Sequence, residues 1–183
     1  PGLLHVLADN QRLRRTDVAV FEMGPTHLRV EGVPTETPML AFVPTGATRP
    51  PSWATAARAY DLADGKGLLE LLARRLGDAR IVWSVADLRS GVDHPGRTGA
   101  ATAHPPAAAD PVPLGRVGEV HPALLEAYDI RAAHVVYGEV PLAALASLVP
   151  EHVVTGELDR PAPIERDLAF VVGVDVPAGT VGE

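Results

Sequence analysis

The fold is decided by the stretch Tyr60–Gly77, YDLADGKGLLELLARRLG. On a helical wheel its leucines gather within an arc of roughly 120°; they are Leu62, Leu68, Leu69, Leu72 and Leu76. Asp61 or Asp64 is placed to cap the amino end and Gly77 to end the helix, and Leu71, off the arc, is a candidate for a second contact. Burial stabilises by about 1.5–3 kcal/mol per leucine. The segment therefore predicts a helix that packs on a sheet.

Strand patterns separated by turn residues lie on both sides of this helix. Before it we expect a short helix over Leu3–Arg12, a strand over Asp17–Gly24 closed by Gly24, and two more strand-and-turn segments over 27–32 and 39–46. After it we expect a strand over 79–88, a loop over Thr98–Pro113, a strand and turn over 112–122, a short helix over 123–130, a strand over 133–142 and one or two helical turns over 142–149. Antiparallel strands interleaved with helices favour an α+β fold over a doubly wound parallel sheet.

The composition excludes several classes of protein. The chain has no cysteine, which excludes disulfides, thiolate zinc sites and cysteine nucleophiles and fits a cytoplasmic setting. Its formal net charge of −7 opposes phosphate binding by the chain as a whole, so any contact with RNA should be local. Neither a secretion signal nor a membrane-spanning run is indicated. Because the chain starts without methionine and ends just after a strand-like run, we expect a fragment of a longer protein.

The segment Asp93–Ala100, DHPGRTGA, holds two residues capable of chemistry. Pro95 fixes its own backbone and Gly96 permits a left-handed conformation, so the sequence predicts a tight turn that places His94 and Arg97 at a strand end. No acidic partner set and no nucleophile accompany them. We therefore interpret Arg97 as a structural or interface ion-pair former.

A second candidate is the pair Glu119 and His121 in GEVHP, which share one face if the segment is a strand. The pair could be a catalytic dyad, or Glu119 could orient His121 before a proline turn. The other histidines lack metal-ligand spacing, no serine has a Gly-x-Ser-x-Gly setting, and neither common phosphate loop is present. No catalytic, cofactor-binding or metal-ligating residue is predicted.

Five motifs occur in an informative order: NQRLRRTDVAVFEMG, YDLADGKGLLELLARRLG, DHPGRTGA, GRVGEVHPALLEAYDI and PIERDLAFVV, the last of which contains Arg166 and Asp167. This order, from about Pro1 to Val176, resembles the C-terminal half of the beta subunit of bacterial phenylalanyl-tRNA synthetase. The resemblance implies an antiparallel sheet with helices, similar to the catalytic module of class II aminoacyl-tRNA synthetases but without the catalytic residues. Residues 1–155 would form this core module, and 156–183 a linker and the first strand of a truncated ferredoxin-like anticodon-binding domain.

The same resemblance implies a role within a larger enzyme. In that family an alpha subunit binds ATP and phenylalanine, and two alpha and two beta chains assemble and charge the tRNA. This fragment would be a scaffold and subunit-interface module without cofactor; ATP and magnesium belong to the parent complex, because the family's magnesium-binding acids align upstream of Pro1. Candidate motif or interface residues are His94, Arg97, Glu119, His121, Arg166 and Asp167. The alternatives are a stand-alone ATP-dependent acid-activating enzyme of this fold and an independent RNA-binding module.

Overall fold

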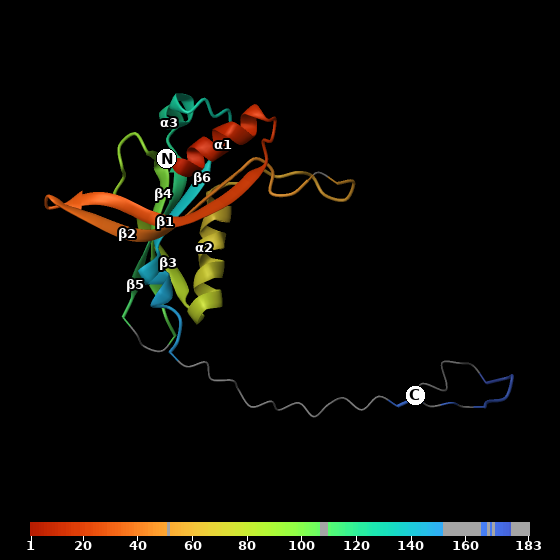
Figure 1. Ribbon diagram of the computed structural model, residues 1–183. Coiled ribbons are helices and arrows are strands. Elements are labelled where there is room, and N and C mark those ends of the chain that lie inside the picture. The colour runs from red at the N-terminus through yellow and green to blue at the C-terminus, as the bar shows by residue number, and fades with distance from the viewer. Residues whose placement is uncertain (51, 107–109, 152–165, 168, 170, 177–183) are drawn as a thin grey trace. The chain divides into compact units, whose positions relative to one another are not determined.

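The computed structural model describes the 183-residue chain except residues 51, 107–109, 152–165, 168, 170 and 177–183 (Figure 1). The chain divides into two compact units, Pro1–Glu151 and His152–Glu183. In the second unit, the described residues between 166 and 176 form no strand, and a turn closes from the Val176 N–H to the Gly173 carbonyl at 3.1 Å. The sequence predicted a strand over 164–176, and this is wrong for the residues of that run that the structure describes. Residues 164, 165, 168 and 170 lie outside the described residues. The domain boundary expected at 155 also lies outside them.

The first unit is built on one six-stranded sheet with the order β1-β2-β6-β5-β4-β3. The strands are β1 (Val18–Val30), β2 (Val33–Thr45), β3 (Arg80–Val85), β4 (Asp93–His104), β5 (Val112–Val120) and β6 (Val136–Pro141). Every pair of neighbours is antiparallel. The α+β prediction with an antiparallel sheet is therefore confirmed.

Helices cover both faces of this sheet. They are α1 (Gly2–Arg12), α2 (Leu62–Gly77), α3 (Pro122–Ala127) and α4 (Leu142–Ala146). On one face, here called the α2 face, α2 and α4 bury a core that includes Phe42, Val117 and Val136. On the other, here called the α1 face, α1 and α3 pack against Val43 and Tyr137. No helix among the described residues is long and apolar enough to cross a membrane.

Helix α2 starts as predicted and ends one residue later. The Asp61 carboxylate accepts from the Ala63 N–H (2.9 Å) and the Asp64 N–H (3.1 Å), while the Asp64 side chain accepts from the Asp61 N–H, which makes a reciprocal capping box. Gly77 is still helical, and the left-handed cap is Asp78 with φ +50°. Gly77 instead allows the Leu148 carbonyl to approach: a Cβ there would lie 1.9 Å from its oxygen.

The leucine pattern of α2 was only partly correct. Leu69 is fully buried and three of the predicted leucines are partly buried against the core: Leu62, Leu72 and Leu76. Leu68 and Leu71 are exposed instead. The buried stripe runs through Gly65, Leu69 and Ala73, because small residues let the helix lie close to Val117 and Val136. The leucine pattern therefore predicted the correct buried side of the helix, but the predicted arc was wider than the stripe of residues that is buried against the sheet.

Two strand predictions were wrong in length. Gly24 does not end a strand, because β1 continues through it to Val30 and pairs with β2 along all thirteen residues of each strand. The predicted loop over Thr98–Pro113 is also wrong at its start, since β4 continues to His104. Ala101 and Ala103 of this strand are buried in the core on the α2 face of the sheet.

The Pro95-Gly96 segment is an irregular, bulge-like stretch within β4 and not a separate turn at a strand end. It lies within β4, and the register to β5 shifts between Asp93 and Thr98. Gly96 has φ +128°, a conformation that L side chains rarely adopt, so the need for glycine was predicted correctly. The bulge turns the backbone so that Arg97 reaches Glu119 of β5.

Candidate functional site

Asp93, the first residue of β4, is the centre of a buried charge cluster on the α1 face. Its side chain has no solvent-exposed surface. Oδ1 accepts from the Tyr137 hydroxyl at 2.5 Å and from Arg89 at 3.0 Å, and Oδ2 accepts from Arg116 at 2.9 Å and from the Arg89 backbone N–H at 2.8 Å. We call Arg89, Asp93, Arg116, Tyr137 and Glu139 the Asp93 cluster. A carboxylate with this many donors is fully satisfied inside the protein.

Arg89 joins this carboxylate to a second one. Its guanidinium donates to Glu139 Oε2 at 2.7 Å and lies 5.6 Å from the centre of the Tyr137 ring. Arg116 also donates to the Asp87 carbonyl at 3.0 Å. Two arginines therefore face two carboxylates, and the charges of the cluster cancel.

The environment shifts the proton affinities of the cluster. Burial alone would raise the pKa of Asp93, but hydrogen bonds from Arg89 and Tyr137 outweigh it, so the pKa of this carboxyl lies below its ordinary value. Burial and the hydrogen bond to Asp93 raise the pKa of Tyr137 to about 12. Asp93 is thus held ionised and Tyr137 protonated, which fits a structural network better than a proton-transfer site.

The backbone of β5 makes this arrangement possible. Gly118 lies between Tyr137 on β6 and Thr98 on β4, to which it is paired. A Cβ at Gly118 would lie 2.6 Å from Thr98 Oγ1 and 3.0 Å from Tyr137 Cε1. The glycine therefore lets the Tyr137 ring lie across β5 toward Asp93.

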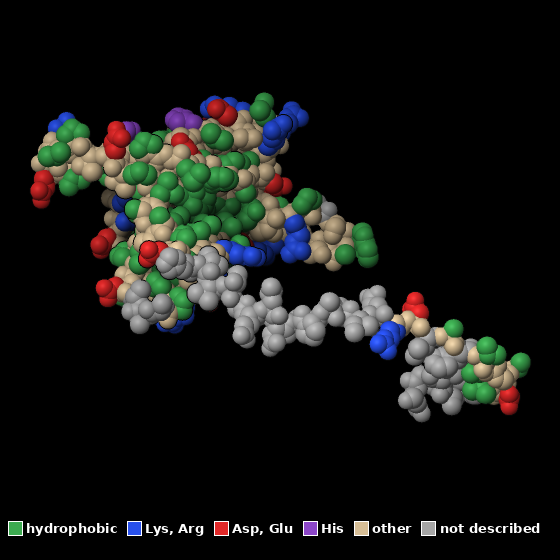
Figure 2. Space-filling model, turned by 60° about the horizontal axis from the view of Figure 1, so that its bottom comes forward, with side chains coloured by type: hydrophobic (Ala, Val, Ile, Leu, Met, Phe, Trp, Pro, Cys, Tyr) green, Lys and Arg blue, Asp and Glu red, His purple; other side chains and the backbone are tan. Residues whose placement is uncertain are grey.

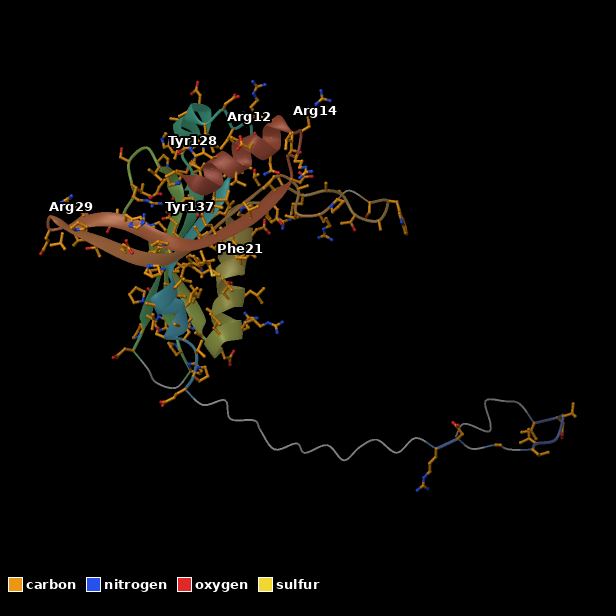
Figure 3. The ribbon with its side chains drawn as sticks, viewed as in Figure 1. Arg12, Arg14, Phe21, Arg29, Tyr128 and Tyr137 are labelled. Atoms are coloured by element: carbon orange, nitrogen blue, oxygen red, sulfur yellow. The ribbon has the colours of Figure 1, made fainter. Side chains whose placement is uncertain are left out.

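A cavity of about 490 Å³ opens beside the cluster, between the amino end of α1 and the sheet. Its wall is mostly apolar and includes Leu4 and Tyr128, with Glu22, Arg89 and Glu139 as its charged members. Figure 3 shows Tyr137 beneath α1 and Tyr128 at α3. Within the described part of the chain, Arg89 is the sole cationic side chain in this wall, and it is already bound to two carboxylates.

A second cluster contains three of the residues that the sequence singled out. Glu119 is buried, and its Oε2 accepts from Arg97 at 2.8 Å and contacts His134 Nδ1 at 3.0 Å. Burial would raise the pKa of Glu119, but the bonds from His134 and Arg97 lower it. These residues and His94 line a cavity of about 380 Å³. The His94 Nδ1 atom is buried there with no hydrogen-bond partner among the described residues.

His121 does not pair with Glu119, contrary to both readings of the GEVHP motif. β5 ends at Val120, so His121 leaves the strand and becomes the N-cap of α3. Its Nδ1 accepts from the Ala123 N–H at 3.1 Å. The remaining predicted residues, Arg166 and Asp167, are exposed in the second unit.

The sequence reasoning missed the Asp93 cluster and His134. The sequence HVVYGEVP indicates that Tyr137 and Glu139 lie together, because larger or polar residues alternate with small or apolar ones. The first set is Val135, Tyr137 and Glu139, and the second is Val136, Gly138 and Val140. On a strand this alternation places Tyr137 and Glu139 together on the side opposite Val136. Asp93 carries no comparable local signal, because Arg116 and Tyr137 lie far from it in sequence.

These features define an α+β domain whose sheet holds a buried, charge-balanced network. Residues 1–142 match the family model described as "Phenylalanyl tRNA synthetase beta chain CLM domain". The chain therefore belongs to the phenylalanyl-tRNA synthetase beta chain family.

Curated relatives agree with this assignment over the length of the chain. It is 34% identical to the phenylalanine–tRNA ligase beta subunit of Ruegeria pomeroyi, with 99% of this chain and 22% of that protein covered. The beta subunit of Dechloromonas aromatica is 32% identical, with 98% and 22% covered, and that of Listeria innocua is 29% identical, with 100% and 22% covered. The chain thus spans about a fifth of the length of these relatives.

Proposed function

We propose that this chain is a non-catalytic module from the C-terminal half of a phenylalanine–tRNA ligase beta subunit, with a fold similar to the class II synthetase catalytic module. The parent enzyme attaches phenylalanine to its tRNA using ATP. The module acts as scaffold and subunit interface within a cytoplasmic assembly of two alpha and two beta chains that binds the tRNA. The antiparallel sheet and the family match support this proposal.

The observation that carries the non-catalytic role is the charge balance of the Asp93 cluster. A site for ATP needs cationic groups that are directed at the phosphates and are not already neutralised by carboxylates of the protein. Arg89 and Arg116 are instead bound to Asp93 and Glu139, and Glu22 adds a further negative charge to the cavity wall. This charge balance at the Asp93 cluster does not suit a triphosphate and supports the proposal.

The carboxylates do not fit a magnesium site either. Asp93 is fully buried and saturated by arginine and tyrosine donors, so it offers no free lone pair to a cation. In the described ranges no group of three or more His, Asp or Glu side chains is arranged to hold a metal ion. We assign ATP and magnesium to the parent complex, at a site on its alpha subunit.

The test compares the full-length beta chain alone with the same chain reconstituted with its alpha subunit. We expect phenylalanine-dependent ATP–pyrophosphate exchange and saturable ATP binding only in the reconstituted complex, together with stable co-purification of the two chains. Exchange or saturable ATP binding by the beta chain alone would favour an acid-activating enzyme. Salt-dependent tRNA binding without any association with the alpha chain would favour an RNA-binding module.

A further inference from the structure

The cavity of about 380 Å³ beside Glu119 has the size and lining of a site for a small molecule. It is bordered by β4, the end of β5, α3 and the segment 129–135 that leads into β6. Its apolar wall is part of the core on the α1 face and includes Val120, Leu125 and Ile130. Small-molecule sites have volumes of about 300–1,000 Å³ and combine an apolar lining with a few polar groups. The polar atoms of this wall therefore decide what it can bind.

Glu119 presents a buried carboxylate to the cavity with only one of its oxygens bonded. Its side chain is 7% exposed, and its two neighbours, Arg97 at 2.8 Å and His134 at 3.0 Å, both contact Oε2. Within the described residues Oε1 has no hydrogen-bond partner. Asp93 shows the usual arrangement of a buried carboxylate, because donors reach both of its oxygens. Glu119 therefore keeps one acceptor available to a molecule in the cavity.

A second polar atom at the same cavity also lacks a partner. His94 lines the cavity, and its buried Nδ1 has no hydrogen-bond partner among the described residues. His94 follows Asp93, which pairs with Val120 at the end of β5, so β4 brings it to the same end of the sheet as Glu119. A buried polar atom without a partner is destabilising, so a ligand that bonds to these two atoms gains from each of them.

The charges of the wall favour a cation. The wall holds three acidic and two basic side chains, which are Glu119, Glu126, Asp129, Arg97 and Arg131. Arg97 is paired with Glu119 and Arg131 lies 3.7 Å from Asp129, whereas Glu126 has no ionic partner among the described residues. Such a wall repels phosphate and carboxylate groups and attracts a positive one. On the outer face drawn in Figure 2, by contrast, acidic and basic side chains lie scattered around an apolar centre.

We propose that this cavity binds a small organic cation with a protonated primary amine and a compact apolar body. A primary ammonium has three N–H donors, which suit Glu119 Oε1 and His94 Nδ1 as acceptors. Asp93 is the precedent in the same sheet, because its single carboxylate accepts from two guanidinium groups. A metal ion fits less well, since in the described ranges no three His, Asp or Glu side chains are arranged to hold one. The inference goes beyond the proposed function and does not depend on it.

The test uses three probes that share a cyclohexane ring and differ in charge. Cyclohexylamine, cyclohexanol and cyclohexanecarboxylate are each titrated into the full-length beta chain near neutral pH, and binding is measured by calorimetry or ligand-observed NMR. We expect saturable binding of cyclohexylamine with a Kd roughly tenfold or more below that of cyclohexanol, because a hydrogen bond between charged groups is the stronger one. The carboxylate should show no saturable binding.

Matched variants locate the site. Glu119→Gln removes the negative charge at the acceptor and should raise the Kd of cyclohexylamine roughly tenfold or more. Glu126→Gln changes an exposed carboxylate of the same wall and should raise the Kd about two- to fivefold. Asp9→Asn is the control, because Asp9 pairs with Arg12 on an exposed surface and does not line the cavity, so it should leave the Kd unchanged.

Each outcome supports or overturns the inference. If no probe binds saturably, water fills the cavity and the inference is wrong. Equal affinity for the amine and the alcohol would overturn the assignment of a cation. An amine affinity that neither Glu119→Gln nor Glu126→Gln changes would place the binding elsewhere on the chain and overturn the site.

Circular dichroism checks the fold of every variant. If Glu119→Gln does not fold, the exposed Glu126→Gln variant and the probe series decide the question. Because the measurement uses the beta chain alone, a negative result leaves the proposed scaffold role as it stands.

Discussion

The Tyr137 hydroxyl donates to Asp93 across an intervening strand, and Gly118 of that strand lies beneath the tyrosine ring. The contact joins β6 to β4 over β5, so three neighbouring strands share one polar interaction. It makes the α1 face of the sheet sensitive to changes at a glycine that carries no functional group of its own.

Replacing that glycine tests the crossing directly. Gly118→Ala is expected to lower the free energy of unfolding by about 1–3 kcal/mol, because the new methyl group would displace Tyr137 or Thr98. Chemical denaturation followed by circular dichroism measures the change. An unaltered midpoint would show that the ring has room to move and that the crossing is not constrained.

The buried carboxylate of Asp93 should contribute more to the free energy of unfolding than an exposed carboxylate does. Asp93→Asn leaves Arg89 and Arg116 without their shared counter-ion, and we expect a loss of about 3–5 kcal/mol in the free energy of unfolding. Asp9→Asn is the control, because Asp9 pairs with Arg12 at 2.7 Å on an exposed surface and should cost at most about 1 kcal/mol. Equal costs for the two variants would refute the structural role of the cluster.

Acid should destabilise the domain by protonating the buried carboxylates of Asp93 and Glu119. The pKa of Asp93 and that of Glu119 are lower in the fold than in the unfolded chain, so folding favours their ionised forms. Their contribution is complete above the ordinary carboxyl pKa of about 4 and is lost as the pH falls through the lowered values. The free energy of unfolding should therefore decline below about pH 5, with a shallower decline in Asp93→Asn. A parallel decline in both proteins would assign the acid sensitivity to other groups.

Two glycines in α2 should respond in opposite directions to the same substitution. A Cβ at Gly65 would lie 2.5 Å from Val136 and 2.8 Å from Val117, so Gly65→Ala should cost about 1–3 kcal/mol despite the better helix propensity of alanine. Gly67 has no atom within 4 Å of such a Cβ, so Gly67→Ala should stabilise by about 0.5–1 kcal/mol. Thermal melts of the pair measure how closely the helix lies on the sheet, and shifts of the same sign would contradict the packing.

The capping box of α2 can be separated from general surface effects. Asp61→Ala removes the acceptor for the Ala63 and Asp64 N–H groups and should cost about 0.5–2 kcal/mol. Asp61→Asn keeps an acceptor and should retain most of that stability. If both variants have the same melting temperature, the loss of stability comes from removing the negative charge beside Arg58 and not from removing the cap.

Local patterns in the sequence account for the elements that were predicted correctly. The helix over Tyr60–Gly77 has a 3.6-residue period and an aspartate cap, both of which act within a few residues. The end of β4 was missed because its alanines resemble a low-complexity loop. Ala101 and Ala103 are buried in a core that also contains residues of α2, and this burial is not visible in the local sequence.

The candidate site was harder to predict for the same reason. The sequence correctly predicted that Arg97 forms an ion pair, but it paired Glu119 with His121 instead of with Arg97. The spacing of two residues along a strand cannot show that the strand ends at Val120, before His121. His134 and Arg116 reach their carboxylates only through the antiparallel register of β5 with its neighbours. Long-range pairing, and not residue type, determined which charged side chains meet.

The sheet order also has a consequence for folding. β1 and β2 form one sequence-local hairpin, and β3 to β6 form a meander of consecutive neighbours. In the described chain, the Met39–Phe42 segment and its partners Gly138–Pro141 form the one continuous ladder between these two pieces, and an isolated bridge joins Thr45 to Val135. This short seam joins segments that are far apart in sequence, so its assembly should limit the folding rate, and amide exchange should report its opening before either piece melts.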